Sequence, residues 1–491
     1  MKKISLPILF FCFIFCTASN LISQNAETMK RDAFSNLDAH YSEYKNIALQ
    51  IWDNAEVGFK EYKSSALLQK TLSDAGFAVQ AGVAEMPTAF IATFGSGKPV
   101  IAILAEYDAL PGLSQMAQPE KKVREGKTSA GHGCGHHLFG TASVAAAIEL
   151  KNQLLKNNMK GTIKLYGCPA EEGGSGKVYL VRAGLFEGVD AVLHWHPNSK
   201  NGANPNSSLA NISAKFRFHG LSAHAAAAPE RGRSALDGVE SMDYMVNMMR
   251  EHIPSETRIH YVITDGGKAP NVVPDFSEVY YYVRHPKPKM AQDIFERVVK
   301  CAKGAAMGTE TTVDYEIIGG TYNLLPNVTL AKVMYDNLVK VGGVKYTDAE
   351  KDFGKKIGAT FLNTPIDYTD NEKIDPFVDR SKMDGTGGST DVSDISWVVP
   401  TVGLGTATWS PGVPAHSWQA VACGGTEIGT KGMINAAKTL AATGLDLFTS
   451  PQTIETATVE FKKARGENFS YKSLLGDRKP ALNYRDGSVN E

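Results

Sequence analysis

The sequence carries no excess of charge of either sign. Its 51 lysines and arginines almost balance 52 aspartates and glutamates, so the formal net charge is −1. No long basic block, internal repeat or low-complexity tract is present in the 491 residues. A chain without a positive field has no general attraction to nucleic acid or to an anionic membrane surface. We therefore expect neither as a partner.

Cysteine is also scarce, with 6 residues in the whole chain. Cys12 and Cys16 lie near the amino terminus, and the other four are Cys134, Cys168, Cys301 and Cys423. This density is far below that of a disulfide-stabilised scaffold, although pairing in an oxidising compartment stays open. The chain length instead predicts two folded domains with at least one large core.

The apolar run at the amino terminus is too short for a comfortable membrane span. It covers residues 4–16 and follows Lys2 and Lys3, whereas a membrane-spanning helix needs about 20 apolar residues. This pattern is typical of a cleaved secretory signal, which we place at residues 1–24. We expect export to the periplasm or beyond, with no membrane span after cleavage. Cys16 would permit a lipid anchor, but the bulky Phe15 before it disfavours one.

Four short apolar segments are each followed by side chains that bind metals or transfer protons. The segments are residues 100–107, 162–167, 191–195 and 402–408, and the side chains are Asp108, Glu171 and Glu172, His196, and His416. Short apolar runs separated by helical stretches are typical of buried parallel strands. Ligands bind beyond the carboxyl ends of such strands, so we expect these residues to meet at one edge of an α/β sheet.

The glycine-rich segment 131–136 contains Cys134 and His136 but has neither the ending of a phosphate loop nor dinucleotide-binding spacing. A lone cysteine or histidine is usually a packed core residue. Thiolate, imidazole and carboxylate groups together, however, are those that hold a transition metal, and an extra carboxylate can act as a base on metal-bound water. The sequence therefore predicts a metal-dependent hydrolase. A nucleophilic Cys134 is the alternative, but it leaves Glu171 and Glu172 without roles.

The middle of the chain has the pattern of a separate α+β domain. After a turn-rich segment at residues 201–206 come a strand, a helix, two strands, a helix and a strand, at residues 212–218, 234–249, 258–264, 277–283, 290–307 and 311–318. This order is that of a ferredoxin-like unit. We expect a catalytic domain at residues 26–208 and 323–449, this inserted domain at residues 209–322, and a C-terminal extension at residues 450–491 with no assigned chemistry.

Six ordered segments resemble the dinuclear metallopeptidase superfamily of aminoacylases and carboxypeptidases. They are residues 131–140, 169–172, 190–197, 222–229, 388–394 and 416–418. The resemblance covers roughly residues 30–450 and is greatest to the amidohydrolase branch that includes p-aminobenzoyl-glutamate hydrolases. It implies a zinc-peptidase-like α/β catalytic domain with an inserted lid that usually also forms the dimer contact.

The resemblance implies two divalent metal ions, Mn²⁺ or Zn²⁺, held by Cys134, His136, Glu172, His196 and His416. It implies that Glu171 is the general base and acid, which takes a proton from metal-bridging water and passes it to the departing amine. Asp108 would orient a ligand such as His136, and a turn-forming aspartate is the alternative. His137 stands where the family has a shorter side chain, which leaves the ligand number and the metal preference open.

The resemblance also assigns residues of the inserted domain. His224 matches a histidine that stabilises the oxyanion, often across a dimer interface. Asn271 and Arg284 match positions that hold the substrate carboxylate, and for Arg284 a surface ion pair is the alternative. In the catalytic domain, His194 lies two residues before His196, and we assign it to packing or to support of a ligand.

The function expected from these residues is hydrolysis of the amide between an acyl or aroyl group and an amino acid. p-Aminobenzoyl-glutamate is the substrate to test first, and a dipeptidase or a general N-acyl-amino-acid hydrolase is the nearest alternative. A non-catalytic envelope protein that binds peptides or metal is an alternative of another class, which the complete set of ligand residues disfavours. We expect a homodimer or an assembly with a homologous subunit.

Overall fold

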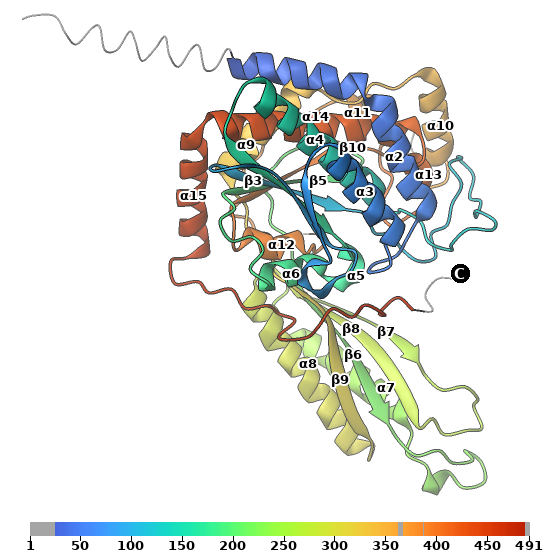
Figure 1. The fold of residues 1–491 in the computed structure, drawn as a ribbon. Coiled ribbons are helices and arrows are strands. Elements are labelled where there is room, and N and C mark those ends of the chain that lie inside the picture. Colours follow the sequence, from blue (N-terminus) through green and yellow to red (C-terminus); the bar gives the residue numbers. More distant parts are fainter. Residues whose placement is uncertain (1–24, 362–366, 386, 487–491) are drawn as a thin grey trace, which may run out of the picture.

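The computed structural model describes residues 25–361, 367–385 and 387–486, and the expected signal segment with Cys16 lies outside these residues. They form two domains, each with its own sheet and its own hydrophobic core (Figure 1). Within the described ranges, no helix has both the length and the hydropathy to cross a membrane. The four described cysteines carry free thiols.

The larger domain is built on a six-stranded sheet with the strand order β1-β2-β4-β3-β5-β10. The strands are β1 (Ala78–Ala81), β2 (Phe90–Ser96), β3 (Val100–Glu106), β4 (Gly161–Cys168), β5 (Ala191–Asn198) and β10 (Thr401–Ala407). The last four run parallel to one another, whereas β2 is antiparallel to both of its neighbours, β1 and β4. The four apolar segments are therefore confirmed as parallel strands whose carboxyl ends share one edge.

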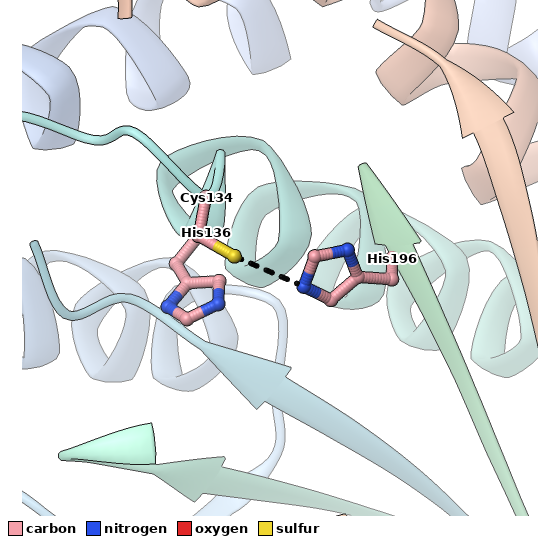
Figure 2. Close-up of side chains that lie close together, drawn as sticks. All are labelled: Cys134, His136 and His196. Carbon is pink, nitrogen blue, oxygen red and sulfur yellow. Dashed lines mark hydrogen bonds between the residues drawn. The ribbon is translucent and has the colours of Figure 1, made fainter. Parts of the chain in front are cut away.

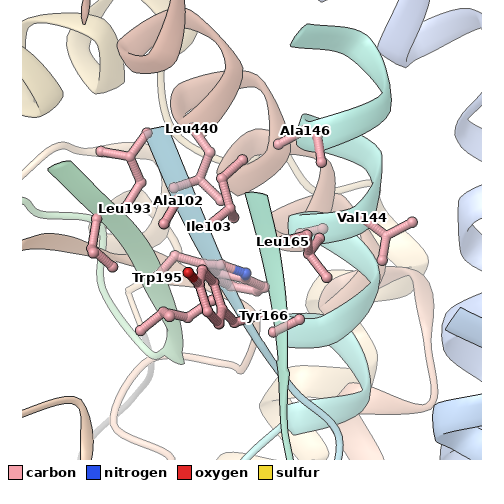
Figure 3. Close-up of a cluster of buried hydrophobic side chains, with 14 of the residues drawn as sticks. Ala102, Ile103, Val144, Ala146, Leu165, Tyr166, Leu193, Trp195 and Leu440 are labelled. Carbon is pink, nitrogen blue, oxygen red and sulfur yellow. The ribbon is translucent and has the colours of Figure 1, made fainter. Parts of the chain in front are cut away.

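Helices pack around this sheet (Figure 1). They comprise residues 25–39, α2 (Tyr41–Asn54), α3 (Tyr62–Asp74), α4 (His136–Lys156), α5 (Glu171–Gly174), α6 (Gly176–Arg182), α9 (Val328–Val341), α10 (Asp348–Gly358), α11 (Thr369–Glu372), α12 (Val392–Ser396), α13 (Trp418–Gly424), α14 (Glu427–Thr449) and α15 (Pro451–Arg465), with the short 3₁₀ helix η1 (Val83–Glu85). Small side chains such as Ala146 let α4 lie close to the sheet and to Leu440 of α14 (Figure 3). This packing fixes the start of α4 at the sheet edge.

The inserted domain has a four-stranded antiparallel sheet with the order β7-β8-β6-β9. Its elements are β6 (Ala210–His219), η2 (Pro229–Arg231), α7 (Ala235–Met249), η3 (Arg250–His252), β7 (Arg258–Asp265), β8 (Phe276–His285), α8 (Pro288–Gly308) and β9 (Thr312–Thr321). The predicted order of strands and helices is confirmed. The α/β class with an inserted ferredoxin-like domain is therefore correct.

The chain ends in a segment that follows α15 and touches both domains. We call residues 466–486 the C-terminal strap. It runs from α15 across the junction between the two domains (Figure 1). Leu474 is buried in the core of the inserted domain, and its neighbour Leu475 is buried in the core of the larger domain. The strap therefore packs against both domains.

Candidate active site

The expected site residues gather at the carboxyl edge of the parallel strands. Asp108 follows β3, Cys134 and His136 lie at the start of α4, Glu171 and Glu172 follow β4, His196 lies near the end of β5, and His416 lies between β10 and α13. Segments far apart in the chain thus meet at one place, as the strand pattern predicted.

Two sets of donor atoms overlap at Cys134. In one set, Cys134, His136 and His196 offer ligand atoms within 4.8 Å of one another (Figure 2), and in the other Cys134 meets Glu172 and His416 at the same spacing. Sγ of Cys134 lies 3.4 Å from Nε2 of His196. The residues that would hold metal ions therefore form two sets, and Cys134 belongs to both.

Hydrogen bonds orient the two ring side chains of the first set. Nδ1 of His136 donates to Oδ1 of Asp108 at 2.9 Å, and Nδ1 of His196 donates to the carbonyl oxygen of Pro197 at 2.7 Å. Each bond directs the Nε2 atom of its ring into the site, as in many metal-binding histidines. Oδ2 of Asp108 also accepts the backbone N–H of Glu172 at 2.9 Å. Asp108 therefore links a ring and a carboxylate of the site.

The backbone after β4 separates the side chains of the adjacent glutamates. Ala170 and Gly173 have φ angles of 56° and 91°, so the chain turns sharply on either side of the pair. Burial raises the pKa of Glu171 well above its ordinary value, and the carboxylates of Glu106 and Glu172 raise it further. Burial by itself would also raise the pKa of Glu172. The contact with His416 at 3.2 Å instead keeps the pKa of Glu172 below its ordinary value. Neighbouring carboxyl groups with opposite shifts are suited to different roles.

Unsatisfied buried atoms at this place fit positively charged ligands. Nε2 of His136 and Oε2 of Glu106 are buried and 3.1 Å apart, yet neither has a hydrogen bond of proper geometry. Oε1 of Glu172 is also buried without a hydrogen bond of proper geometry. Leaving a buried donor or acceptor unpaired costs about 1–3 kcal/mol. A bound cation would satisfy these atoms, so the residues present fit the metal ions that the sequence predicts.

A buried ion-pair network beside the site was missed by the sequence reasoning. Nζ of Lys177 lies 2.7 Å from Oε1 of Glu106 and 2.6 Å from Oδ1 of Asp391. Glu106 also forms a third possible donor set, with His136 and Glu171. The sequence offered one signal, the charged residue Glu106 near the end of the apolar segment 100–107. An apolar side chain is usual at such a buried position.

Two further histidines of the motifs point away from the donor atoms. His137 lies buried with Nε2 3.0 Å from the carbonyl oxygen of Gly424, and its ring contacts that of His132. His194 packs on Gly403, where an added Cβ would come within 2.3 Å of its Nε2 atom. Burial lowers the pKa of His194 to about 3, so this ring is neutral. The structure thus places both rings among packed residues and not in either donor set.

The environment of Cys134 does not favour a nucleophilic thiolate. Burial raises the pKa of its thiol, and the nearby carboxylate of Glu172 raises it further. Reactive cysteines instead lie in electropositive, partly exposed surroundings. The cysteine-hydrolase alternative therefore lacks the activation that its chemistry requires.

A cavity of about 640 Å³ opens beside these residues, between the two domains. Arg284 of β8 lines it and stacks on Tyr282, with its guanidinium carbon 5.3 Å from the ring centre. Nη1 of Arg284 lies 3.5 Å from Oγ of Ser389. Among the described residues, the ion pairs include none between a carboxylate and Arg284.

The other two residues expected from the inserted domain lie elsewhere. His224 and Asn271 are exposed and belong to adjoining loops, where the N–H of Ala225 donates to the carbonyl oxygen of Asn271 at 3.0 Å. These loops lie at the end of the inserted domain away from the larger domain (Figure 1). Neither residue lines the cavity of its own chain.

Comparisons with known proteins agree with the fold and the motifs. Residues 102–412 match the model of "Peptidase family M20/M25/M40". A p-aminobenzoyl-glutamate hydrolase subunit of Escherichia coli (strain K12) is 43% identical over 434 residues, which cover 84% of this chain and 90% of that protein. An Xaa-Arg dipeptidase of Mus musculus is 30% identical over 455 residues, which cover 89% and 93%. A solved dinuclear metal-binding M20 peptidase of Bacillus subtilis shares the fold, with a TM-score of 0.55, 16% identity, and coverage of 84% of this chain and 99% of that one.

The fold, the motifs and the relatives together define a hydrolase of amide bonds. The chain belongs to peptidase family M20/M25/M40. The resemblance drawn from the six segments is thereby confirmed, and so is the expectation of an enzyme.

Proposed function

We propose that this chain is a dinuclear metal-dependent amidohydrolase that releases an amino acid from an acyl or aroyl group, with p-aminobenzoyl-glutamate as its substrate. The observation that carries the proposal is the pair of donor sets that share Cys134 beside the carboxyl group of Glu171. The name of the relative that is 43% identical supports the choice of substrate.

The proposed ligands are Cys134, His136 and His196 for one ion, and Cys134, Glu172 and His416 for the other. Sulfur, nitrogen and oxygen donors in one centre suit several divalent metals, so Mn²⁺ and Zn²⁺ are both candidates. When bound, the ions would polarise the scissile carbonyl group and make water a stronger acid.

In this proposal Glu171 carries the proton through the reaction. Its carboxylate accepts a proton from the water whose oxygen attacks the carbonyl carbon. The same carboxyl group then donates the proton to the amide nitrogen as the carbon–nitrogen bond breaks. The raised pKa of Glu171 supports this role, because an efficient proton carrier has a pKa nearer to the working pH than an ordinary carboxyl group has.

We also propose that His224 and Asn271 serve the active site of a second chain. Nδ1 of His224 accepts the N–H groups of Ala226 and Ala227 at 3.2 and 3.1 Å, so the neutral ring carries its proton on Nε2. That N–H is suited to stabilise an oxyanion. The second chain is another copy or a homologous subunit, since the E. coli relative is itself named a subunit.

The dipeptidase alternative is weaker for a basic substrate. The mouse relative is named for dipeptides that end in arginine, but the cavity here is lined by the guanidinium groups of Arg284 and Arg485. Like charges placed close together cost several kcal/mol at an interface. A substrate with a basic carboxyl-terminal residue is therefore disfavoured relative to an acidic one.

The test is release of glutamate from p-aminobenzoyl-glutamate by the purified chain without residues 1–24, loaded with Mn²⁺ or Zn²⁺. Glu171→Ala and a chelator-treated sample are the controls, and an Xaa-Arg dipeptide is the competing substrate. We expect release that both controls abolish and that metal restores. A metal-loaded protein that cleaves only the dipeptide would refute the proposed substrate.

Export of the mature chain is a further proposal that follows from the amino-terminal pattern. Mass measurement of the protein recovered from the cell envelope would detect removal of the segment near residue 24. An intact amino terminus retained in the cytoplasm would refute it.

A further inference from the structure

The inserted domain presents a row of polar side chains to the cavity between the two domains. We propose that Asn211, in the middle of this row, determines specificity by accepting a hydrogen bond from the N–H group of the scissile amide. The inference rests on the proposed function and narrows its substrates to secondary amides. Amides whose nitrogen carries an alkyl group in place of the hydrogen are then poor ligands.

Three side chains on neighbouring strands form this row. Asn211 of β6 pairs with Arg284 of β8 on one side and with Thr321 of β9 on the other. Residues paired directly across antiparallel strands point to the same face of a sheet, with Cβ atoms about 4.5–5.5 Å apart. All three residues line the cavity, and we call them the polar row. The opposite face of β6, with Ile212 and Ala214, is buried in the core of the inserted domain.

Contacts with the larger domain hold the polar row at the active site. Gly319 of β9, close to one end of the row, packs against the loop that follows β4. An added Cβ at Gly319 would lie 3.3 Å from Oγ of Ser175. At the other end of the row, Nη1 of Arg284 lies 3.5 Å from Oγ of Ser389. The row therefore lines the same cavity as Glu171 and is close to the loop that carries it.

Each member of the polar row has a buried polar atom without a hydrogen-bond partner among the described residues. These atoms are Nε of Arg284, Oδ1 of Asn211 and Oγ1 of Thr321. A hydroxyl group can rotate to donate or to accept, so Thr321 does not specify the kind of partner, whereas the amide oxygen of Asn211 only accepts. Leaving a buried acceptor unpaired costs free energy. Asn211 therefore matches a ligand that supplies a hydrogen-bond donor.

The amide N–H group is a donor that lies next to the α-carboxylate in a secondary N-acyl amino acid. One carbon atom separates the amide nitrogen from that carboxylate. Arg284, the expected partner of the carboxylate, is the direct neighbour of Asn211 in the row. A guanidinium donor beside an amide acceptor thus matches a carboxylate acceptor beside an N–H donor. A site that hydrogen-bonds a substrate N–H strongly rejects an analogue without it, because the buried polar group of the site is left unpaired.

The same contact assists the proton transfer of the proposed reaction. As water adds to the carbonyl carbon, the amide nitrogen loses its conjugation and gains a lone pair, which takes the proton from Glu171 as the carbon–nitrogen bond breaks. An acceptor that holds the N–H of this nitrogen limits its rotation and so fixes the direction of the lone pair. Asn211 then contributes to orientation as well as to binding.

The experiment compares p-aminobenzoyl-glutamate, the parent compound, with an analogue that carries a methyl group on the amide nitrogen. Calorimetry measures the binding of each compound to the metal-loaded chain with Glu171→Ala, which prevents turnover. To this background are added Asn211→Leu, which keeps a similar shape, or Asn211→Ala, which leaves the site open. Ser213→Ala is the matched control, because Ser213 lines the same cavity two residues along β6 and its hydroxyl group already has partners.

We expect both Asn211 variants to weaken binding of the parent compound by about 10- to 100-fold, as an unpaired buried hydrogen-bonding group predicts. Binding of the N-methyl analogue should weaken by less than about threefold, because this compound cannot make the contact. The conformational preference of the N-methyl amide is the same in every variant, so it cancels in the comparison. Ser213→Ala should leave the ratio between the two compounds at its background value.

An equal loss for both compounds would overturn the inference, because it would show that Asn211 only maintains the structure of the inserted domain. Unchanged binding of the parent compound would overturn it as well. Thermal unfolding identifies a variant that does not fold, and the other Asn211 variant then decides. Failure of the metal-loaded background protein to bind the parent compound is a different result, which would refute the proposed substrate itself.

Discussion

Nζ of Lys177 lies 2.7 Å from Oε1 of Glu106, and solvent reaches almost no part of either side chain. The same ammonium group pairs with Asp391, while the second oxygen of Glu106 faces His136. One buried lysine thus compensates two buried carboxylates beside a proposed metal ligand. Removing it would leave both charges unpaired.

Lys177→Met should therefore destabilise the protein by about 3–5 kcal/mol, the usual cost of breaking a buried ion pair from one side. The free energy of urea-induced unfolding measures this effect. Lys70→Met is the matched control, because Lys70 pairs with Asp74 at the surface, where such pairs contribute about 1 kcal/mol or less. Equal losses in the two variants would contradict the prediction.

Substitution of the adjacent glutamates should separate catalysis from metal binding. Glu171→Gln should retain bound metal and lose activity by about 10²- to 10⁴-fold, the range of general acid–base catalysis. Glu172→Gln should lose metal, because an amide is a weaker ligand than a carboxylate. Metal content by mass spectrometry and kcat measured on the same samples distinguish these outcomes. Loss of metal from Glu171→Gln with full occupancy in Glu172→Gln would reverse the assignment.

The adjacent histidines offer a similar contrast. His136→Gln should lower the metal content, since its Nε2 atom belongs to a donor set. His137→Gln should leave the metal content unchanged and cost about 1–3 kcal/mol of stability, because its buried contact with the carbonyl oxygen of Gly424 is lost. Metal analysis and thermal unfolding of the two variants test this pair. A metal-depleted His137→Gln would make His137 a ligand.

The strands and most of the site could be predicted because their signals are local. An apolar run such as residues 100–107 predicts a strand buried on both faces, and a polar residue just after it lies at the carboxyl edge. The same reasoning predicted that His196 and Glu171, which are distant in the sequence, lie at the same edge of the sheet. These inferences need only the rule that parallel strands align their ends.

Other parts depend on contacts that leave no local pattern. Lys177 follows a glycine-rich turn, where a lysine is usually exposed, and its partner Asp391 lies 214 residues further along the chain. Arg485 lies 313 residues from Glu172, whose carbonyl oxygen it contacts. Neither pair has a periodicity or a spacing that the sequence alone reveals, so the ion-pair network and the contact between the strap and the loop of Glu172 emerge only from the packed chain.

Stability should depend on pH through Asp394. Burial raises its pKa in the folded protein to about 7, and the neighbouring Asp391 raises it as well, whereas an aspartate in an unfolded chain titrates near pH 4. Between these values the folded state binds more protons than the unfolded state, so the free energy of unfolding falls as the pH rises from about 4 to about 7. The difference from Asp394→Asn, which cannot titrate there, should change by up to roughly 4 kcal/mol across this window. A difference that stays constant with pH would contradict the assignment.

Mixing two inactive variants tests whether His224 acts on a neighbouring chain. Glu171→Ala removes the proton carrier of its own site, and His224→Ala removes a group that, in this proposal, serves the partner's site. A mixed dimer would then contain one site with both residues intact. Random exchange of subunits in a symmetric dimer should restore roughly a quarter of wild-type activity, because about half of the dimers are mixed and each has one working site. The activity of the mixture, measured after subunit exchange and compared with each variant alone, decides the matter. If the mixture is as inactive as each variant alone, although native mass spectrometry detects the mixed dimer, His224 does not act across the interface.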